Sequence, residues 1–265
     1  MASKAVKPSP ITADLFTLAG QTAVVTGGGS GIGKAIALGL AQRGANVGIV
    51  DFAAEGAAET AARVAEMGVG SLAIAADVTD EDGMTSAVEK TVHALGPLSL
   101  AVNAAGIAQA TPALELSAEQ FERLYRINVI GLFRSCQAEA RAMMASGGGS
   151  ILNLASISGI VSHREMLQAH YNSSKAAVAH LTRSLATEWA AHSIRVNALS
   201  PGFTLTPMNA RAEVASMREE ISEKIPTGRF AEPEEMVGPA VFLLSNAASY
   251  CTGVDLVVDG GYTLL

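Results

Sequence analysis

Short apolar runs alternate with longer helical patterns along most of this chain, and this alternation limits the folds that it can adopt. Each run is four to six residues long without the polar alternation of a half-exposed strand, and the runs lie at residues 22–26, 47–50, 72–75, 98–102, 150–154, 194–199 and 254–258. Such runs are typical of strands covered on both faces. Segments with helical spacing separate them, among others at residues 34–43, 55–66, 80–94 and 172–190. Strands joined by helices form right-handed crossovers, so the sequence predicts an α/β fold with a doubly wound parallel sheet of about seven strands and helices on both faces.

The chain is expected to form a single domain. No low-complexity linker divides it, so residues 18–265 are assigned to one domain that follows a polar N-terminal leader at residues 1–17. Residues 203–226 interrupt this alternation, because they contain no apolar run typical of a strand and are polar with residues that favour helices. They follow the carboxyl end of a predicted strand, where parallel sheets bind ligands. We expect a substrate lid there; a helical pair that only closes the domain edge is the alternative.

The composition argues against several classes of function. The formal net charge of −7 gives no basis for binding nucleic acid or an anionic membrane. No stretch reads as a membrane span or a signal peptide, so a cytoplasmic location is expected. Cys136 and Cys251 lie far apart without a CxxC pair, which indicates free thiols rather than a zinc site or a disulfide framework. No metal is expected.

A glycine-rich loop joins the first predicted strand to the first helix, with the sequence Thr-Gly-Gly-Gly-Ser-Gly-Ile-Gly at residues 26–33. Glycine lets the backbone approach a ligand closely, and the helix that follows offers unpaired N–H groups and a positive dipole end to a pyrophosphate. Residues 28–34 also match the start of a nucleoside triphosphatase loop, but Ala35 stands where that loop needs Ser or Thr to bind magnesium. We therefore expect a dinucleotide, held by Gly27, Ser30, Gly31, Ile32 and Gly33.

Asp51 predicts which dinucleotide is bound. It ends the second strand about twenty residues past the glycines, where a dinucleotide-binding fold places a carboxylate on the adenosine ribose. Its charge would repel the 2′-phosphate of NADP, and Phe52, Ala53 and Ala54 supply no cation to offset it. Lys34, the nearest basic residue in the loop region, is expected to face solvent. The predicted cofactor is NAD.

Tyr171 and Lys175 are a candidate proton-transfer pair. They lie four residues apart at the start of a predicted helix, so both side chains project from one face. A free phenol has a pKa of about 10, and a lysine ammonium held close to it favours the phenolate. Such a pair can take an alcohol proton as hydride leaves for nicotinamide, or return it in the reverse direction. Taken alone, the pair is also compatible with a helical tyrosine beside a solvated lysine.

Several motifs together resemble the short-chain dehydrogenase/reductase family. Residues 26–33 match its TGxxxGxG loop, and residues 171–175, Tyr-Asn-Ser-Ser-Lys, match YxxSK. Residues 103–106, Asn-Ala-Ala-Gly, match NNAG except at Ala104. The matches keep the family's order, and they imply a single Rossmann-type domain. They also imply further cofactor contacts, at Asp77 and Val78 against adenine, at Asn103, and at Pro201, Gly202 and Thr206 toward the nicotinamide carboxamide.

The same resemblance implies a catalytic tetrad of Asn128, Ser156, Tyr171 and Lys175. Aligning residues 153 and 159 with the family pattern selects Ser156 rather than Ser158 as the catalytic serine. Ser156 would polarise the substrate oxygen while Tyr171 transfers the proton. Lys175 would hold the ribose hydroxyls and shift the tyrosine toward its phenolate. Asn128 would anchor a water that relays protons to solvent.

The loop before Tyr171 is polar, which is unlike a pocket for steroids or acyl chains. The end of the chain, residues 248–262, is similar to that of sugar-alcohol dehydrogenases of this family. We therefore predict an oxidoreductase that transfers a hydride between NAD and a small polyol or its ketose, with Ser158 and His163 lining the substrate pocket beside Ser156 and Tyr171. The spacing of His163 and His170 lies outside any short zinc motif.

Two other functions remain open at this stage. One is an NAD(P)-dependent carbonyl reductase that acts on a 3-oxoacyl thioester or a diketone, and the other is a non-catalytic NAD-sensing scaffold. The resemblance also implies a homotetramer assembled through the long helices after the fourth and fifth strands.

Overall fold

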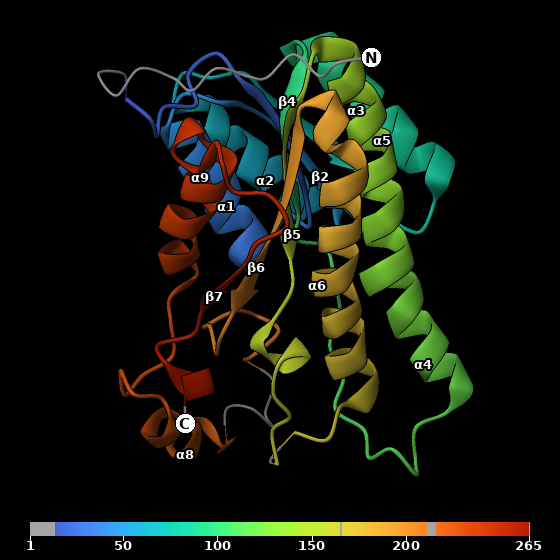
Figure 1. The fold of residues 1–265 in the computed structure, drawn as a ribbon, viewed down its shortest axis with the longest axis vertical. Coiled ribbons are helices and arrows are strands. Elements are labelled where there is room, and N and C mark those ends of the chain that lie inside the picture. The colour runs from blue at the N-terminus through green and yellow to red at the C-terminus, as the bar shows by residue number, and fades with distance from the viewer. Residues whose placement is uncertain (1–13, 165, 211–215, 265) are drawn as a thin grey trace.

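The computed structural model describes residues 14–164, 166–210 and 216–264. Within these ranges, seven strands form one parallel sheet in the order β3-β2-β1-β4-β5-β6-β7 (Figure 1). The strand order reverses between β1 and β4, and a parallel sheet opens a ligand crevice at the carboxyl ends of its strands at such a reversal. The predicted doubly wound α/β fold is confirmed. The strands are β1 (Thr22–Thr26), β2 (Asn46–Asp51), β3 (Ser71–Ala75), β4 (Leu98–Asn103), β5 (Gly149–Leu154), β6 (Ile194–Pro201) and β7 (Asp255–Val258).

Every predicted apolar run falls on one of these strands. The largest difference is in β6, which continues to Pro201 and so carries its carboxyl end into the crevice. The four predicted helical segments are also present, with ends shifted by a few residues. The α-helices are α1 (Gly31–Gln42), α2 (Ala54–Ala65), α3 (Glu81–Leu95), α4 (Ala118–Tyr125), α5 (Leu132–Ser146), α6 (Ala169–Trp189), α8 (Arg218–Lys224) and α9 (Val237–Leu244).

Helices cover both faces of the sheet. α1, α2 and α9 pack on one face and α3, α5 and α6 on the other, so each face has its own apolar core (Figure 1). Ile36 and Leu40 of α1 and Met84 of α3 are fully buried in these cores. Burying a side chain of this size contributes roughly 1.5–3 kcal/mol, so the paired cores hold the sheet rigid beneath the crevice.

Local signals explain where several helices begin and end. α4 begins with a capping box, in which the Ser117 hydroxyl accepts from the Gln120 N–H and the Gln120 side chain accepts from the Ser117 N–H. α3 and α5 end at Gly96 and Gly147, whose φ angles of 101° and 97° are strained for any residue with a Cβ.

Arg195, near the start of β6, ties the C-terminal segment to the sheet. Its guanidinium donates to the carbonyls of Leu243, Leu244 and Ser245, at distances of 2.7, 3.1 and 3.1 Å, where α9 ends. It also donates to the Cys251 carbonyl, at 3.2 Å. A cation at a helix C-terminus satisfies orphan carbonyls and complements the helix dipole. Burial lowers the pKa of this guanidinium.

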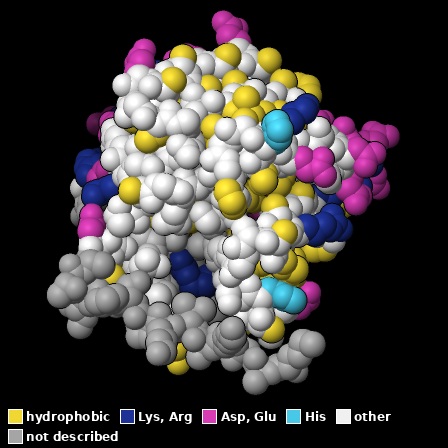
Figure 2. Space-filling view, turned by 90° about the horizontal axis from the view of Figure 1, so that it is seen from above, with side chains coloured by type: hydrophobic (Ala, Val, Ile, Leu, Met, Phe, Trp, Pro, Cys, Tyr) yellow, Lys and Arg dark blue, Asp and Glu magenta, His cyan; other side chains and the backbone are white. Residues whose placement is uncertain are grey.

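The surface and the predicted segments add three findings. Figure 2 shows acidic side chains gathered at the margins of one face of the molecule, with basic side chains between them. No helix among the described residues has both the length and the apolar character needed to cross a bilayer. Of the predicted leader, residues 1–13 lie outside the described residues, as do residues 211–215 of the predicted lid.

Candidate active site

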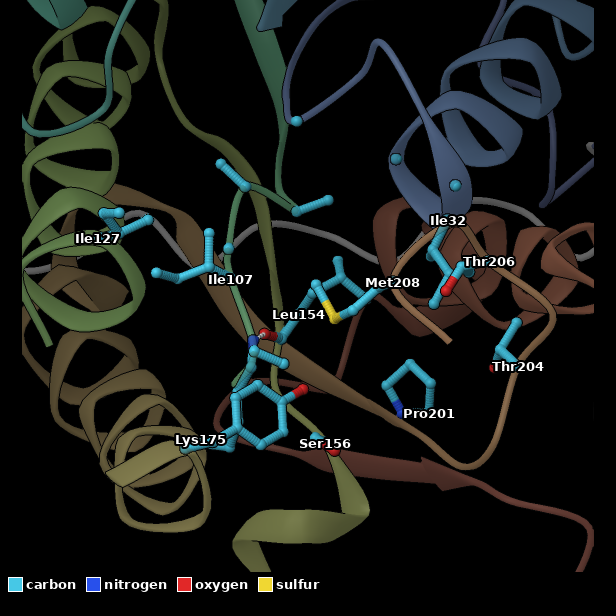
Figure 3. A pocket seen from close by; sticks show the side chains of 18 of the residues that line it. Ile32, Ile107, Ile127, Leu154, Ser156, Lys175, Pro201, Thr204, Thr206 and Met208 are labelled. Atoms are coloured by element: carbon cyan, nitrogen blue, oxygen red, sulfur yellow. Dashed lines mark hydrogen bonds between the residues drawn. The ribbon is translucent and has the colours of Figure 1, made fainter. Parts of the chain in front are cut away.

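A pocket of about 560 Å³ lies at the carboxyl ends of the strands. Segments that follow six of the seven strands line it, which is the position expected from the reversal in strand order. Figure 3 shows Ser156 and Lys175 at one end of this pocket and Ile32 with Thr206 at the other. Most of the side chains predicted from the sequence therefore converge on one cavity.

The glycine loop forms a cradle at the start of α1. Gly27 has a φ of +67°, and a Cβ on it would stand 2.6 Å from the backbone nitrogen of Ala105. Gly31 has a φ of +52°, and a Cβ on it would lie 3.5 Å from the Thr206 methyl carbon. Ser30 is the N-cap of α1, yet its side chain makes no cap hydrogen bond and no acidic residue occupies the first turn. Backbone N–H groups at the helix start are thus available to an anion, and these residues fit a pyrophosphate.

Asp51 at the end of β2 is fixed in position by two backbone donors. Its Oδ2 accepts from the Gly29 N–H at 2.8 Å, and its Oδ1 accepts from the Ala53 N–H at 2.9 Å. Lys34 does not simply face solvent as predicted, because its ammonium pairs with the Glu59 carboxylate at 2.6 Å. The pairing lowers the pKa of Glu59, mainly through the hydrogen bond from Lys34. The carboxylate of Asp51 therefore lines the pocket while the nearby cation is engaged elsewhere.

The other predicted cofactor segments also lie on the pocket. Asp77 and Val78 line it after β3, and the Asp77 carboxylate accepts from the Thr79 N–H at 2.8 Å. Pro201 lines it at the end of β6, and Gly202 and Thr206 line it just after that strand. A Cβ on Gly202 would lie 2.7 Å from the Cα of Asp259, so a larger residue would displace this part of the wall.

Asn103 is the exception among the predicted cofactor residues. Its side chain points into the protein and is only 2% exposed. Its Nδ2 lies 2.9 Å from Oε2 of Glu139, 3.1 Å from Oδ1 of Asn153 and 3.3 Å from Sγ of Cys136. Only its neighbours in the chain, from Ala104 to Ala108, line the pocket. The side chain of Asn103 therefore links the ends of β4 and β5 to α5, inside the protein and away from the pocket.

Glu139 of α5 is a buried carboxyl in that polar network, and nothing in the sequence pattern predicted its burial. It is fully buried, and its Oε1 has no hydrogen-bond partner among the described residues. Burial raises its pKa to about 8, against a smaller lowering by the hydrogen bond from Asn103. A carboxyl in this environment is held in its neutral form at neutral pH.

Tyr171 and Lys175 project from the first turns of α6 into the pocket, as the spacing predicts. The Lys175 ammonium lies 5.8 Å from the centroid of the Tyr171 ring and donates to the Leu154 carbonyl at 2.7 Å. Burial lowers the pKa of Lys175 to about 8. Ser156 lines the pocket after β5, and its hydroxyl oxygen accepts the Ser158 N–H at 3.1 Å. Because that oxygen already has a donor, the Ser156 hydroxyl hydrogen is available to a ligand oxygen.

Asn128 lies on a π-helical turn, Arg126–Gly131, between α4 and α5. Its side chain does not line the pocket: the amide exchanges two 2.9 Å hydrogen bonds with the backbone of Ile107 and donates to the Ser174 hydroxyl at 3.3 Å. Gly106 separates it from Lys175, since a Cβ there would be 3.2 Å from Asn128 Oδ1 and 3.8 Å from Lys175 Nζ. Asn128 therefore holds the loop after β4 against α6, close to Lys175.

The predicted substrate residues Ser158 and His163 line the pocket beside Ser156, and both side chains are nearly buried. Tyr262, which contacts His163 from the end of the described chain, was missed because no sequence motif links it to this loop. His170 lies elsewhere, with its ring 6.4 Å from that of Phe121, and burial lowers its pKa. Within the described ranges no three His, Cys, Asp or Glu side chains are grouped to hold a metal ion.

Comparison with known proteins shows similarity along almost the whole chain. Residues 27–263 match the family model described as enoyl-(acyl carrier protein) reductase. The galactitol 2-dehydrogenase (L-tagatose-forming) of Cereibacter sphaeroides is 44% identical over 94% of this chain and 98% of its own length. The D-threitol dehydrogenase of Mycolicibacterium smegmatis is 40% identical over 94% of this chain and 95% of its own.

Solved structures agree with the fold. A short-chain type dehydrogenase/reductase from Mycobacterium marinum superposes with a TM-score of 0.91 at 40% identity, over 95% of this chain and 99% of that one. A gluconate 5-dehydrogenase from Burkholderia cenocepacia J2315, solved with NADP and tartrate, gives a TM-score of 0.88 at 33% identity, over 95% and 98% of the two chains.

Fold, pocket and relatives define a dinucleotide-binding oxidoreductase that acts on CH–OH groups. The chain belongs to the short-chain dehydrogenase/reductase family, whose members use a nicotinamide cofactor.

Proposed function

We propose that this protein is an NAD-dependent dehydrogenase that interconverts a small polyol and its ketose, with Tyr171 as the general acid and base. The observation that carries this proposal is the convergence of Ser156, Tyr171 and Lys175 on one end of a pocket whose other end is a glycine-lined anion cradle. A nicotinamide bound between these ends supplies the hydride acceptor or donor.

The three side chains have complementary roles. The Ser156 hydroxyl, which already accepts from the Ser158 N–H, donates its own hydrogen to the substrate oxygen. Tyr171 takes the proton of the alcohol in the oxidative direction and returns it in the reductive direction. Lys175 is mostly protonated at pH 7, given its pKa of about 8, and its charge near the Tyr171 ring favours the phenolate. One ammonium hydrogen goes to the Leu154 carbonyl, which leaves two for the ribose hydroxyls.

Asn128 has a supporting role in this scheme. Its side-chain amide is occupied by Ile107 and Ser174, so the water that it anchors is assigned to its backbone. In a π-helical turn the backbone carbonyls do not follow the regular α-helical pairing, and such turns are frequent at functional sites.

The preference for NAD rests on Asp51. Its two backbone donors hold the carboxylate where the adenosine ribose is expected, and the nearby cation Lys34 is paired with Glu59. A 2′-phosphate would meet this charge without compensation. The NADP-bound relative makes cofactor choice the first measurement, because a preference for NADPH would favour the carbonyl reductase alternative.

The polyol substrate is supported by two observations. The pocket wall beside Ser156 carries the hydrogen-bonding groups of Ser158, His163 and Gln168. Relatives at 44% and 40% identity are named for galactitol and D-threitol. A panel of tetritols, pentitols, hexitols and their ketoses, followed by NADH absorbance, identifies the substrate.

The central test is Tyr171→Phe. We expect kcat to fall by about 10²- to 10⁴-fold, because the proton-transfer group is removed, while NADH affinity measured by fluorescence stays within about twofold. Tyr125→Phe is the matched control, since Tyr125 stacks on Phe121 at 4.8 Å and does not line the pocket. Near-normal turnover of the Tyr171 variant would refute the mechanism and favour the non-catalytic scaffold.

Assembly and location belong to the same proposal. Phe121, Ile130 and Met144 are partly exposed apolar side chains on α4, the π-turn and α5, where a homotetramer would bury them. Light scattering measures the mass of the assembly and so tests for a tetramer.

Cys136 and Cys251 are free thiols, as expected of a protein kept in the reducing cytoplasm.

A further inference from the structure

A chain of polar side chains forms one wall of the pocket beside Ser156. The Ser158 hydroxyl lies 3.3 Å from Nε2 of His163 and accepts from Nε2 of Gln168 at 3.4 Å. On the other side of the imidazole, Nδ1 of His163 lies 3.1 Å from the hydroxyl of Tyr262. Ser158, His163 and Gln168 are 7%, 5% and 5% exposed, so their contacts are shielded from bulk water. Both nitrogens of the imidazole thus have protein partners.

Aromatic packing holds the imidazole in place. The His163 ring lies 5.2 Å from the Phe203 ring and 5.3 Å from the Tyr262 ring, and these two rings meet edge to face at 5.3 Å. Phe203 follows β6 and Tyr262 follows β7, so the ends of two strands position the imidazole. A side chain that is packed and hydrogen-bonded in this way loses little entropy when a ligand binds.

The hydroxyl of Ser158 retains one hydrogen-bonding position for a ligand. A hydroxyl has one donor and two acceptor positions, and Gln168 uses one acceptor. If His163 carries its proton on Nε2, it uses the second acceptor and the Ser158 hydrogen remains for a ligand. If the proton is on Nδ1, the Ser158 hydrogen goes to Nε2 and one lone pair remains. Either tautomer leaves a single position, and a substrate hydroxyl can match a donor or an acceptor.

The backbone of Ser158 contacts the serine that is proposed to polarise the reacting oxygen. The Ser158 N–H donates to the Ser156 hydroxyl oxygen at 3.1 Å, so the two serines form a compact turn at the end of β5. Both residues line the same pocket as Tyr171. A substrate oxygen held by Ser156 would therefore have its neighbouring oxygen next to Ser158.

We propose that Ser158 is a second oxygen-binding position that selects substrates with a vicinal diol or its hydroxyketone, and that His163, Gln168 and Tyr262 are positioning residues that orient it. The proposal rests on the dehydrogenase activity proposed above and names the substrate feature that the site recognises. It assigns to Tyr262, far from the catalytic motif in the sequence, an indirect effect on substrate choice.

The test compares cyclohexanol with cis- and trans-1,2-cyclohexanediol, which share a ring and differ by one hydroxyl. We expect wild-type kcat/KM to be higher for at least one diol by roughly tenfold or more. Ser158→Ala and Tyr262→Phe should each lower kcat/KM for that diol by roughly fivefold to tenfold, and leave cyclohexanol within about twofold. Tyr250→Phe, which changes a fully exposed tyrosine, is the control and should affect neither substrate.

The outcomes separate the two proposals. Equal wild-type rates on cyclohexanol and both diols, or equal losses on both substrate types in the variants, would overturn the second oxygen-binding position while the dehydrogenase activity stands. The NADH affinity of each variant, measured by fluorescence, shows whether the cofactor-binding part of the pocket is intact. If the wild-type protein oxidises neither these alcohols nor any polyol with NAD or NADP, the proposed function fails and this inference fails with it.

Discussion

Replacing Glu139 with glutamine should make the protein more stable at alkaline pH. The carboxyl is fully buried, and its pKa is raised by burial from 4.5 to about 8. Between these two values the folded protein keeps the proton and the unfolded chain releases it, so the free energy of unfolding falls as pH rises. At about 1.4 kcal/mol per pH unit, the wild type loses about 3 kcal/mol by pH 7 and about 4 kcal/mol by pH 8, where the folded protein begins to release the proton as well. Glutamine does not ionise, so Glu139→Gln should lack this loss.

The glutamine also fits the site. It has nearly the shape of the neutral carboxyl, and its oxygen can accept from Asn103 as Oε2 of Glu139 does. Its amide would stand where Oε1 has no partner among the described residues, which costs about 1–3 kcal/mol. The variant should therefore be no more stable than the wild type at pH 5, and more stable by about 1–3 kcal/mol at pH 8.

Urea unfolding followed by the fluorescence of Trp189, the single tryptophan, measures this difference. Curves at pH 5, 7 and 8 give the pH dependence for each protein. Glu188→Gln, on the exposed side of α6, is the matched control and should follow the wild type at all three values. If Glu139→Gln and the wild type lose stability in parallel, within about 1 kcal/mol, the neutral buried carboxyl is refuted.

Two further predictions concern the cofactor and the fold. Asp51→Asn should raise kcat/KM for NADP relative to kcat/KM for NAD by roughly tenfold or more, because the substitution removes the charge that repels the 2′-phosphate. An unchanged ratio in steady-state assays with both cofactors would contradict this role of Asp51. Arg195→Met should lower the free energy of unfolding by about 2–4 kcal/mol, because it leaves the carbonyls at the end of α9 without their donor. Urea unfolding compares it with Arg183→Met, an exposed arginine on α6 whose replacement should change stability little.

The fold was largely predictable because its signals are local. The run at residues 22–26 and the glycines after it required nothing but neighbouring residues to indicate a buried strand, a turn and a helix start. Asp51 and the Tyr171–Lys175 pair were predictable for the same reason, since strand ends and helix faces place them.

The features that the sequence did not predict depend on contacts between residues that lie far apart in the chain. Glu139 stands in an Ala-Glu-Ala-Arg segment that is typical of an exposed helix face. The hydrogen bond to its buried carboxyl comes from Asn103, 36 residues away in the sequence. The π-helical turn at Asn128 arises where the side chain exchanges bonds with Ile107, 21 residues away. The contact of His163 with Tyr262 spans 99 residues. No periodicity or short motif encodes separations of this size.

Tyr262 has a consequence for how the protein could be altered. The groups proposed to bind NAD and to move the proton lie on segments that precede β7, whereas one support of the substrate wall comes from the segment that follows it. If Tyr262 has the positioning role proposed above, a substitution at residue 262 is expected to leave cofactor binding intact and to change which alcohols are turned over. On the same proposal, relatives that differ in the segment after β7 are expected to differ in substrate selectivity while they keep the same chemistry.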